Sequence, residues 1–344
     1  MSKVLLQVND LKTCFHTPKG PVIAVDGVSF AIEKASTLGL TGESGSGKTT
    51  IACSILGLIP YLSRVSGSSL EKAASRGAVV DGEVLFKGRD LLKLSKDEIR
   101  RIRGKEISII FQNPIPSLHP VEMIGSQVGE ALEAHEQVRR EEIAEVVLEY
   151  LGKVDLKDAE YRYHNVPNMF SGGEGQRIMV AMALICGPSL LIADEPTKSL
   201  DVTVQRQVLQ LLKKMKEMFN LSMLLITHDL GIIAELSDHV GIMYAGKLVE
   251  YSDVMSIYKK PKHPYTRGLL TATPSIAGPK KELRGLRGDP PNPLVPIPGC
   301  KFHPRCKHAT HDCRTKDPPL MEIQPGHRVA CLRAHDLPDF ESIA

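Results

Sequence analysis

The stretch Gly42-Glu43-Ser44-Gly45-Ser46-Gly47-Lys48-Thr49 follows the short apolar run Thr37 to Thr41 and precedes a helical pattern over Lys48 to Leu58. Its order of Gly, four residues, Gly, Lys and Thr matches the P-loop, in which glycines let backbone N–H groups surround phosphate oxygens. The start of the following helix adds the positive end of its dipole. We therefore predict that this loop binds a nucleotide, with Lys48 at the β- and γ-phosphates and the Thr49 hydroxyl on Mg²⁺.

The composition excludes several classes of protein. The chain has 344 residues, with 43 Lys plus Arg, 40 Asp plus Glu and a formal net charge of +3, whereas proteins that coat nucleic acid usually carry a strong basic excess. The absence of Trp also argues against stacking platforms for single strands. Apolar runs such as Ile107 to Phe111 are far shorter than the roughly 20 residues of a membrane-spanning helix. Because Met1 to Asp10 does not resemble a signal peptide, we expect a cytosolic chain that crosses no membrane.

Apolar runs alternate with helical periodicity through the first 250 residues of the chain, which predicts an α/β layer architecture. A helix is expected after Leu200, and Val128 to Leu151 forms a helical block between two strand regions, as an inserted subdomain would. Ser63 to Gly82, rich in Ser, Gly and Ala, is predicted to be an exposed loop. Strands are expected at Val4 to Val8, Val22 to Phe30, Leu38 to Thr41, Ile107 to Phe111, Leu190 to Ala193 and Met223 to Thr227.

Two acidic residues, Asp194 and Glu195, follow the apolar run Leu190 to Ala193. An acid at the carboxyl end of a strand faces the ligand crevice of an open α/β sheet. Asp194 is therefore a candidate to hold Mg²⁺, and Glu195 is a candidate general base for the attacking water. The alternative is an acidic helix cap or turn without a ligand.

A second glycine-rich motif, Ser171-Gly172-Gly173-Glu174-Gly175-Gln176-Arg177, opens a helical pattern. Ser171 is a good N-cap residue, and the N–H groups of Gly172 and Gly173 offer a second place where a helix start meets an anion. Taken alone, the motif is as well explained by a simple helix cap.

Taken together, these motifs resemble the ATP-binding subunits of ABC transporters. Ser171 to Arg177 is similar to the signature sequence of that family, although Phe170 stands where the family has Leu. Lys198 is another departure, at a position where many members have a small or hydroxyl residue. Four more residues match family positions: Phe15, the aromatic residue that stacks on adenine, Gln112 of the Q-loop, Asp201 in the D-loop Ser199-Leu200-Asp201, and His228 of the H-loop.

The resemblance implies a role for each matched residue. The catalytic residues would be Glu195, His228 and Gln112, and the Mg²⁺ ligands would be Thr49, Gln112 and Asp194. ATP would be contacted by Phe15, Gly42, Glu43, Ser44, Gly45, Ser46, Gly47, Lys48, Thr49, Thr50, Ser171, Gly172, Gly173, Gln176 and Asp201. Alternatives remain for single residues: Gln112 as a strand-end amide, His228 as a buried structural histidine, and Phe15 as a core residue.

The resemblance also implies the domain organisation. Members of the family have a RecA-like core, an antiparallel β region and an inserted helical subdomain, which places a cassette at residues 1–255 with its helical subdomain at about 115–185. Residues 256–344 would form a small cysteine-rich C-terminal extension. Several stretches are similar to oligopeptide, dipeptide and nickel importers: Phe111 to Pro120, Ala193 to Thr197, Asp201 to Gln205, His263 to Arg267 and the tail from Gly299 to Cys331.

Four of the seven cysteines, Cys300, Cys306, Cys313 and Cys331, lie in this tail, after a connector rich in Pro and Gly. A cytosolic chain rarely keeps disulfides, so such a group indicates metal or cluster binding. No Cys-x-x-Cys pair of the kind typical of zinc sites occurs. Four thiolates on a loop-rich segment suit a [4Fe–4S] cluster, and the resemblance implies one. Zinc and free thiols are the alternatives.

The resemblance finally implies an ATPase that powers the import of di- or oligopeptides. The P-loop of one subunit would meet the signature of a second ABC ATPase subunit, identical or a paralogue, in a head-to-tail dimer. The segment Gln112 to Pro120 would contact a transmembrane permease on the cytoplasmic side of the cell membrane, served indirectly by an extracellular solute-binding protein. The alternatives are a nickel or sugar importer, a regulatory cassette on a cluster-binding module, and a cassette that acts on nucleic acid.

Overall fold

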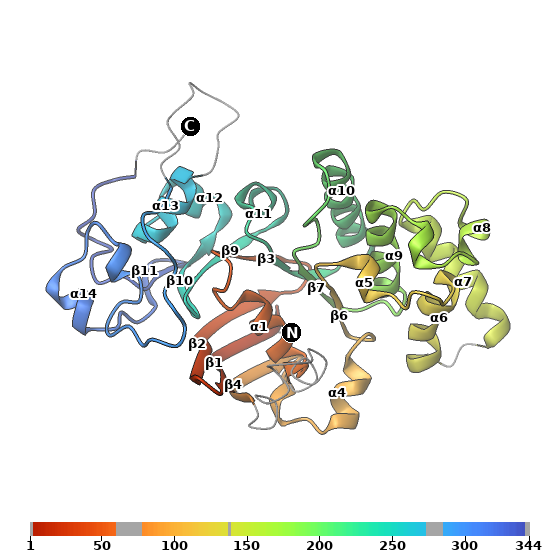
Figure 1. Cartoon of the computed structure of the whole chain (residues 1–344), viewed down its shortest axis with the longest axis horizontal. Coiled ribbons are helices and arrows are strands. Elements are labelled where there is room, and N and C mark those ends of the chain that lie inside the picture. Colours follow the sequence, from red (N-terminus) through yellow and green to blue (C-terminus); the bar gives the residue numbers. More distant parts are fainter. Residues whose placement is uncertain (1–2, 60–77, 137–138, 273–284, 341–344) are drawn as a thin grey trace. The chain divides into compact units, whose positions relative to one another are not determined.

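The computed structural model describes residues 3–59, 78–136, 139–272 and 285–340 (Figure 1). The chain divides into two compact units. The first contains Met1–Leu5, Ile32–Thr37 and Lys93–Ile226, and the second contains Leu6–Ala31, Leu38–Leu92 and Thr227–Ala344. None of the helices in the described part of the chain is both long enough and apolar enough to cross a membrane.

The first unit is built on three parallel strands in the order β8-β7-β6, which are β6 (Ile107–Ile110), β7 (Leu190–Asp194) and β8 (Ser222–Ile226). Every residue of β7 and β8 is buried. Parallel strands covered on both faces require such continuous apolar runs, because neither face meets water. The α/β architecture predicted from the sequence is confirmed.

Most helices of the first unit lie between β6 and β7 in the sequence, drawn in yellow to green in Figure 1. They are α5 (Pro114–Ser117), α6 (Ile124–His135), α7 (Arg140–Lys153), α8 (Ala159–Tyr163), η2 (Pro167–Met169) and α9 (Gly172–Leu184). The single helical block expected over Val128 to Leu151 is therefore wrong. The helix α6 ends at His135, and the next residue, Glu136, takes an extended backbone conformation. Side chains of α6, α7 and α9 share one apolar cluster, which includes Val128, Val147 and Ile178.

Two further helices complete this unit: α4 (Lys96–Ile102), after the short η1 (Leu91–Lys93), and α10 (Val202–Phe219). The helix predicted after Leu200 is confirmed as α10. Its buried residues Val208, Leu211, Leu212 and Met215 recur at helical spacing, so one face packs into the core while the other stays polar.

A four-stranded sheet in the order β2-β1-β4-β5 forms one part of the second unit, apart from the ends of its first two strands. The strands are β1 (Val4–Thr17), β2 (Gly20–Glu33), β4 (Ala78–Phe86) and β5 (Arg89–Asp90). β1 and β4 run antiparallel from Leu6 opposite Phe86 to Phe15 opposite Ala78. The loop predicted over Ser63 to Gly82 is wrong for residues 78–82, which begin β4 with the β-branched pair Val79-Val80. Residues 63–77 lie outside the described residues.

The other sheet of the second unit has the order β3-β9-β10-β12-β11. β3 (Thr37–Thr41) is parallel to β9 (His239–Tyr244), and β10 (Lys247–Asp253), β12 (His327–Val329) and β11 (Met321–Gln324) continue it in antiparallel pairs. The C-terminal segment thus extends the sheet that carries the P-loop. The accompanying helices are α1 (Lys48–Ile55), α11 (Leu230–Leu236), α12 (Val254–Lys259), α13 (Pro264–Ala272), η3 (His303–Arg305) and α14 (His311–Thr315).

A buried carboxylate, Glu250 on β10, anchors the C-terminal segment. It is fully buried and accepts hydrogen bonds from the backbone N–H groups of Lys262 and His263 and from Nε2 of His327 at 2.6, 2.9 and 2.7 Å. Nδ1 of His263 in turn accepts a hydrogen bond from the N–H of Tyr265 at 3.1 Å. A buried charge is tolerated only when such donors surround it.

Burial lowers the pKa of His263 from 6.5 to about 4, so the folded protein keeps this ring neutral where the unfolded chain protonates it. Between about pH 6.5 and pH 4 the unfolded state binds one more proton at this site, so stability falls as the pH falls through that window. We predict that this site removes on the order of 2–3 kcal/mol of unfolding free energy over the window.

Urea titrations at pH 7.5 and 4.5 would measure this loss, with His263→Gln as the comparison, because glutamine does not titrate. The variant is expected to lose less stability on acidification than the parent. Equal losses in both proteins would contradict the prediction.

Candidate nucleotide site

The predicted P-loop connects buried β3 to α1 within the second unit. Gly42, Gly45 and Gly47 have positive φ angles of 146°, 77° and 101°, which L side chains rarely adopt. A Cβ on Gly42 would lie 2.1 Å from the carbonyl oxygen of Met243, and one on Gly47 would lie 2.3 Å from that of Ala24. The loop therefore runs against the backbone of its neighbours, which only glycine permits at these two positions.

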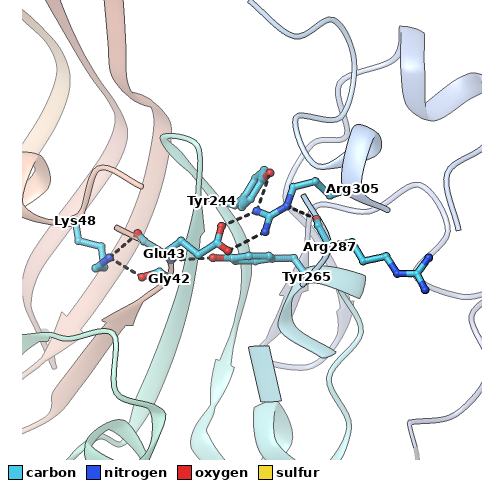
Figure 2. A network of polar contacts seen from close by, with 7 residues as sticks. All are labelled: Gly42, Glu43, Lys48, Tyr244, Tyr265, Arg287 and Arg305. Carbon is cyan, nitrogen blue, oxygen red and sulfur yellow. Dashed lines mark hydrogen bonds and ion pairs between the residues drawn. The ribbon is translucent and has the colours of Figure 1, made fainter. Parts of the chain in front are cut away.

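Lys48, the first residue of α1, folds back over this loop and is 7% exposed. Its Nζ donates hydrogen bonds to the carbonyl oxygens of Gly42 and Glu43 at 2.7 and 3.0 Å (Figure 2). It also donates one to Oγ of Ser46 at 3.2 Å. The ammonium is thus held at the mouth of the loop, where it is able to meet phosphate oxygens. Thr49, the next residue, is exposed.

Two other predicted site residues lie in the second unit. Phe15, near the end of β1, is partly buried and pairs with Ala78 of β4. His228 is exposed, which argues against the alternative of a buried structural histidine. It is followed by Asp229, whose carboxylate caps α11 by accepting hydrogen bonds from Gly231 and Ile232.

The acidic pair lies in the first unit, at the carboxyl end of β7. Asp194 is the last residue of the strand and is 3% exposed. Glu195 has a φ angle of 49°, and its N–H donates to the carbonyl of Ile226, which ends the parallel neighbour β8, at 2.8 Å. A left-handed conformation at a residue other than glycine is unfavourable, and such positions concentrate at functional sites.

Gln112 follows β6, the other parallel neighbour of β7. The carboxyl ends of parallel strands meet at one edge of a sheet, so Gln112, Asp194 and Glu195 share that edge of the first unit. Oxygen donors of this kind, a carboxylate and an amide, suit Mg²⁺.

Ser171 begins α9 with a complete capping box. Its Oγ accepts a hydrogen bond from the N–H of Glu174 at 3.4 Å, while the Glu174 carboxylate accepts one from the N–H of Ser171 at 2.9 Å. Ser171 and Gly172 are exposed, but Gln176 is buried, and its Nε2 has no hydrogen-bond partner among the described residues. Asp201 caps α10 with bonds of 3.0 Å from the N–H groups of Thr203 and Val204.

The four tail cysteines, Cys300, Cys306, Cys313 and Cys331, all line one small cavity of about 20 Å³, together with His263, His303 and His308. Burial raises the pKa of Cys300 and Cys331 to about 11 and also raises that of Cys306. Within the described residues, however, no group of three or more His, Cys, Asp or Glu side chains is placed to hold a single metal ion.

One set of contacts had no counterpart in the sequence patterns. The guanidinium of Arg305 forms a two-pronged ion pair with the carboxylate of Glu43, and the OH of Tyr265 accepts a hydrogen bond from the N–H of Glu43 at 2.9 Å (Figure 2). Tyr265 belongs to a stretch singled out for its resemblance, His263 to Arg267. Arg305 and Glu43 are 262 positions apart, and no local pattern joins them.

The fold and these motifs define a P-loop ATP-binding cassette. The profile described as "ABC transporter" matches residues 25–198, and the one described as "Oligopeptide/dipeptide transporter, C-terminal region" matches residues 249–313. The chain therefore belongs to the ABC transporter family, as the motifs suggested.

Curated relatives match along almost the whole chain. The oligopeptide transport ATP-binding protein AppD of Bacillus subtilis (strain 168) is 44% identical, over 95% of this chain and 96% of its own length. The oligopeptide transport ATP-binding protein OppD of Salmonella typhimurium is 42% identical, over 96% and 94%. Among solved structures, the dimeric structure of MJ0796, a bacterial ABC transporter cassette, matches with a TM-score of 0.59 at 25% identity, over 72% of this chain and 98% of its own.

The glycine constraint gives a direct test of the loop. We predict that Gly47→Ala lowers the affinity for MgATP by about tenfold or more, because a displaced loop no longer aims its N–H groups at phosphate and strained backbone costs about 1–3 kcal/mol. Titration calorimetry would measure the affinity. Gly88→Ala is the matched control, since Gly88 also has a positive φ but a Cβ there meets nothing within 4 Å. An unchanged affinity in Gly47→Ala would contradict the prediction.

Proposed function

We propose that this chain hydrolyses ATP to power the import of di- or oligopeptides through a membrane permease. The observation that carries the proposal is the similarity to oligopeptide transport ATP-binding proteins over nearly the full length, including the C-terminal region, which matches a second family model at residues 249–313. In this proposal the P-loop binds ATP, and the carboxylates of Asp194 and Glu195 at the end of β7 serve its cleavage.

In this proposal each predicted site residue has a separate role in binding or cleaving ATP. Lys48, the P-loop amides and Thr50 hold the phosphates, Phe15 contacts the base, and Thr49, Gln112 and Asp194 hold Mg²⁺, whose chemistry is to neutralise phosphate charge. Glu195 accepts a proton from the attacking water, while Gln112 and His228 orient that water and the γ-phosphate. The backbone strain at Glu195 supports its assignment as the base.

A complete site needs a second subunit, because Ser171, Gly172, Gly173, Gln176 and Asp201 act on the ATP held by a partner. The exposed Ser171 and Gly172 at the start of α9 are available for such a contact. MJ0796, a cassette with a similar fold, is dimeric in its solved structure. In this arrangement a second ABC ATPase subunit, identical or paralogous, pairs head to tail with the chain.

The same proposal places the chain in a larger assembly. Residues 1–255 form the cassette, with a helical subdomain at about 115–185, and residues 256–344 form the extension. The chain lies on the cytoplasmic side of the cell membrane, held by the permease through the segment after β6. An extracellular solute-binding protein delivers the peptide.

Transport in liposomes tests this function. The chain, its partner ATPase and the permease would be reconstituted with the solute-binding protein, and ATP hydrolysis would be measured with added peptides, with nickel and with sugars. Stimulation by peptides and uptake of labelled peptide are expected. Stimulation by nickel or sugar without any by peptides would overturn the proposal.

We predict that Glu195→Gln nearly abolishes ATP turnover while leaving ATP binding intact and producing a stable ATP-bound dimer. The amide keeps the size of the side chain but does not accept the proton, and a general base contributes about 10²–10⁴-fold in rate. Lys48→Ala is the comparison, because it removes a ground-state phosphate contact and should lose affinity as well. Turnover, calorimetry and size-exclusion chromatography separate the two, and Glu195→Gln turnover within about twofold of the parent would contradict the prediction.

We also propose that Cys300, Cys306, Cys313 and Cys331 hold a [4Fe–4S] cluster. Their convergence on one cavity supports this assignment, and the raised thiol pKa values mean that iron must displace protons on binding. The cluster would hold together a segment with little apolar core of its own.

Protein purified without oxygen is therefore expected to be brown, with about four irons per chain. Cys306→Ser should bleach the colour and make residues 285–340 more sensitive to protease, while part of the ATPase activity survives. Cys186→Ser is the matched control, because Cys186 is partly buried but lies in the first unit, outside the tail. Stoichiometric zinc, or a colourless tail as resistant to protease as the parent's, would count against the cluster.

A further inference from the structure

The ion pair between Arg305 and Glu43 joins the cysteine-bearing tail to the P-loop (Figure 2). Nη1 of Arg305 lies 2.6 Å from Oε2 of Glu43, and Nη2 lies 2.9 Å from Oε1. The side chains are 7% and 24% exposed. A paired, parallel geometry with so little solvent is the strong form of this interaction, unlike a flexible surface ion pair.

Several contacts besides Glu43 fix the position of the Arg305 side chain. Its Nε donates to the carbonyl oxygen of Arg287 at 2.9 Å, Nη1 donates to the OH of Tyr244 at 3.4 Å, and the guanidinium lies over the Tyr244 ring. Tyr244, Tyr265 and Phe302 pack together with ring centroids 4.6–5.4 Å apart, which joins the tail to β9 and α13. Arg305 ends η3 and immediately precedes Cys306, one of the four cysteines of the cavity.

Glu43 is fixed from both of its ends. Its carboxylate pairs with Arg305, while its N–H donates to Tyr265 and its carbonyl accepts from Nζ of Lys48 and from the N–H of Ser46 at 3.0 and 3.2 Å. The position of the Glu43 side chain is therefore linked to the same stretch of backbone that contacts Lys48. A shift at Glu43 is passed to the loop that receives the phosphates.

The charge of Glu43 gives the pair its function. An acidic side chain within a loop that binds a polyanion repels the ligand unless a cation neutralises it or it is turned away. Arg305 neutralises the charge of Glu43 and also keeps the carboxylate turned away from the ligand, because its planar fork binds both carboxylate oxygens.

We propose that Arg305 is a positioning residue of the nucleotide site, which neutralises Glu43 and fixes the P-loop, so that the cysteine-bearing tail sets the affinity for ATP. The inference rests on the proposed binding of ATP at Gly42 to Thr49. Arg305 contacts no substrate in this proposal. It changes the affinity for ATP only by acting on Glu43.

The test measures MgATP affinity by calorimetry and steady-state ATPase kinetics on the full chain. Arg305→Gln is expected to weaken ATP affinity by about tenfold, the usual size of coupling between linked sites, with a matching rise in KM. At saturating ATP its kcat should stay within about twofold of the parent, because no group that acts on the attacking water has changed. Arg305→Lys should restore part of the affinity, since it keeps the charge without the fork.

The double variant Glu43→Gln with Arg305→Gln separates this role from a merely structural one. Once the unpaired carboxylate is gone, most of the affinity lost in Arg305→Gln should return. Arg287→Gln is the matched control: its side chain is exposed and points away from Glu43 in Figure 2, so its affinity should equal the parent's.

Two results would overturn the role of Arg305: parental affinity in Arg305→Gln, or a double variant as weak as Arg305→Gln alone. The second result would mean that loss of tail packing, rather than the charge of Glu43, weakens binding. Lys48→Ala in parallel distinguishes this failure from failure of the proposed site. If Lys48→Ala loses affinity and Arg305→Gln does not, only the role of Arg305 fails; if Lys48→Ala keeps full affinity, the P-loop site itself is wrong.

Discussion

The close approach of the P-loop to neighbouring backbone is the constraint on which the rest of the second unit depends. Gly42 lies against the carbonyl of Met243 on β9, and Gly47 lies against that of Ala24 on β2. Because these contacts leave no room for a Cβ, the loop is shaped by two strands that belong to different sheets. Any element that moves β9 therefore moves the phosphate cradle, and the tail is such an element, since Phe302 packs on Tyr244 of β9.

The tail is attached by polar groups as well as by aromatic packing. Glu250 accepts one hydrogen bond from the N–H of Lys262, just before α13, and another from His327 of β12. His327 lies 77 positions further along the chain than Glu250. A buried carboxylate with several donors favours one arrangement, because any slip of β12 against β10 would remove the His327 donor from the buried charge. β12 thus joins β10 in a fixed register, with Glu250 opposite Val329.

Those parts of the molecule that depend on local chemistry were predictable from the sequence. The P-loop, the N-cap at Ser171 and the amphipathic α10 each follow from the local sequence, and the structure contains all three. The break between α6 and α7 was missed because the apolar spacing of the two helices continues across it, and no Gly or Pro marks the end at His135. The Arg305–Glu43 pair was missed for a different reason, because it arises only when the tail packs beside the loop.

The sequence separation of that pair has a consequence for biosynthesis. Glu43 leaves the ribosome 262 residues before Arg305, a delay of about 13–50 s at synthesis rates of roughly 5–20 residues per second. During this interval the nascent cassette carries an uncompensated acid beside its phosphate loop, so a chain that stops before the tail is a poor competitor for ATP. Fragments that end before the tail would then bind nucleotide less tightly than the full chain. They would therefore be less able to take its place in a transporter in the nucleotide-bound state.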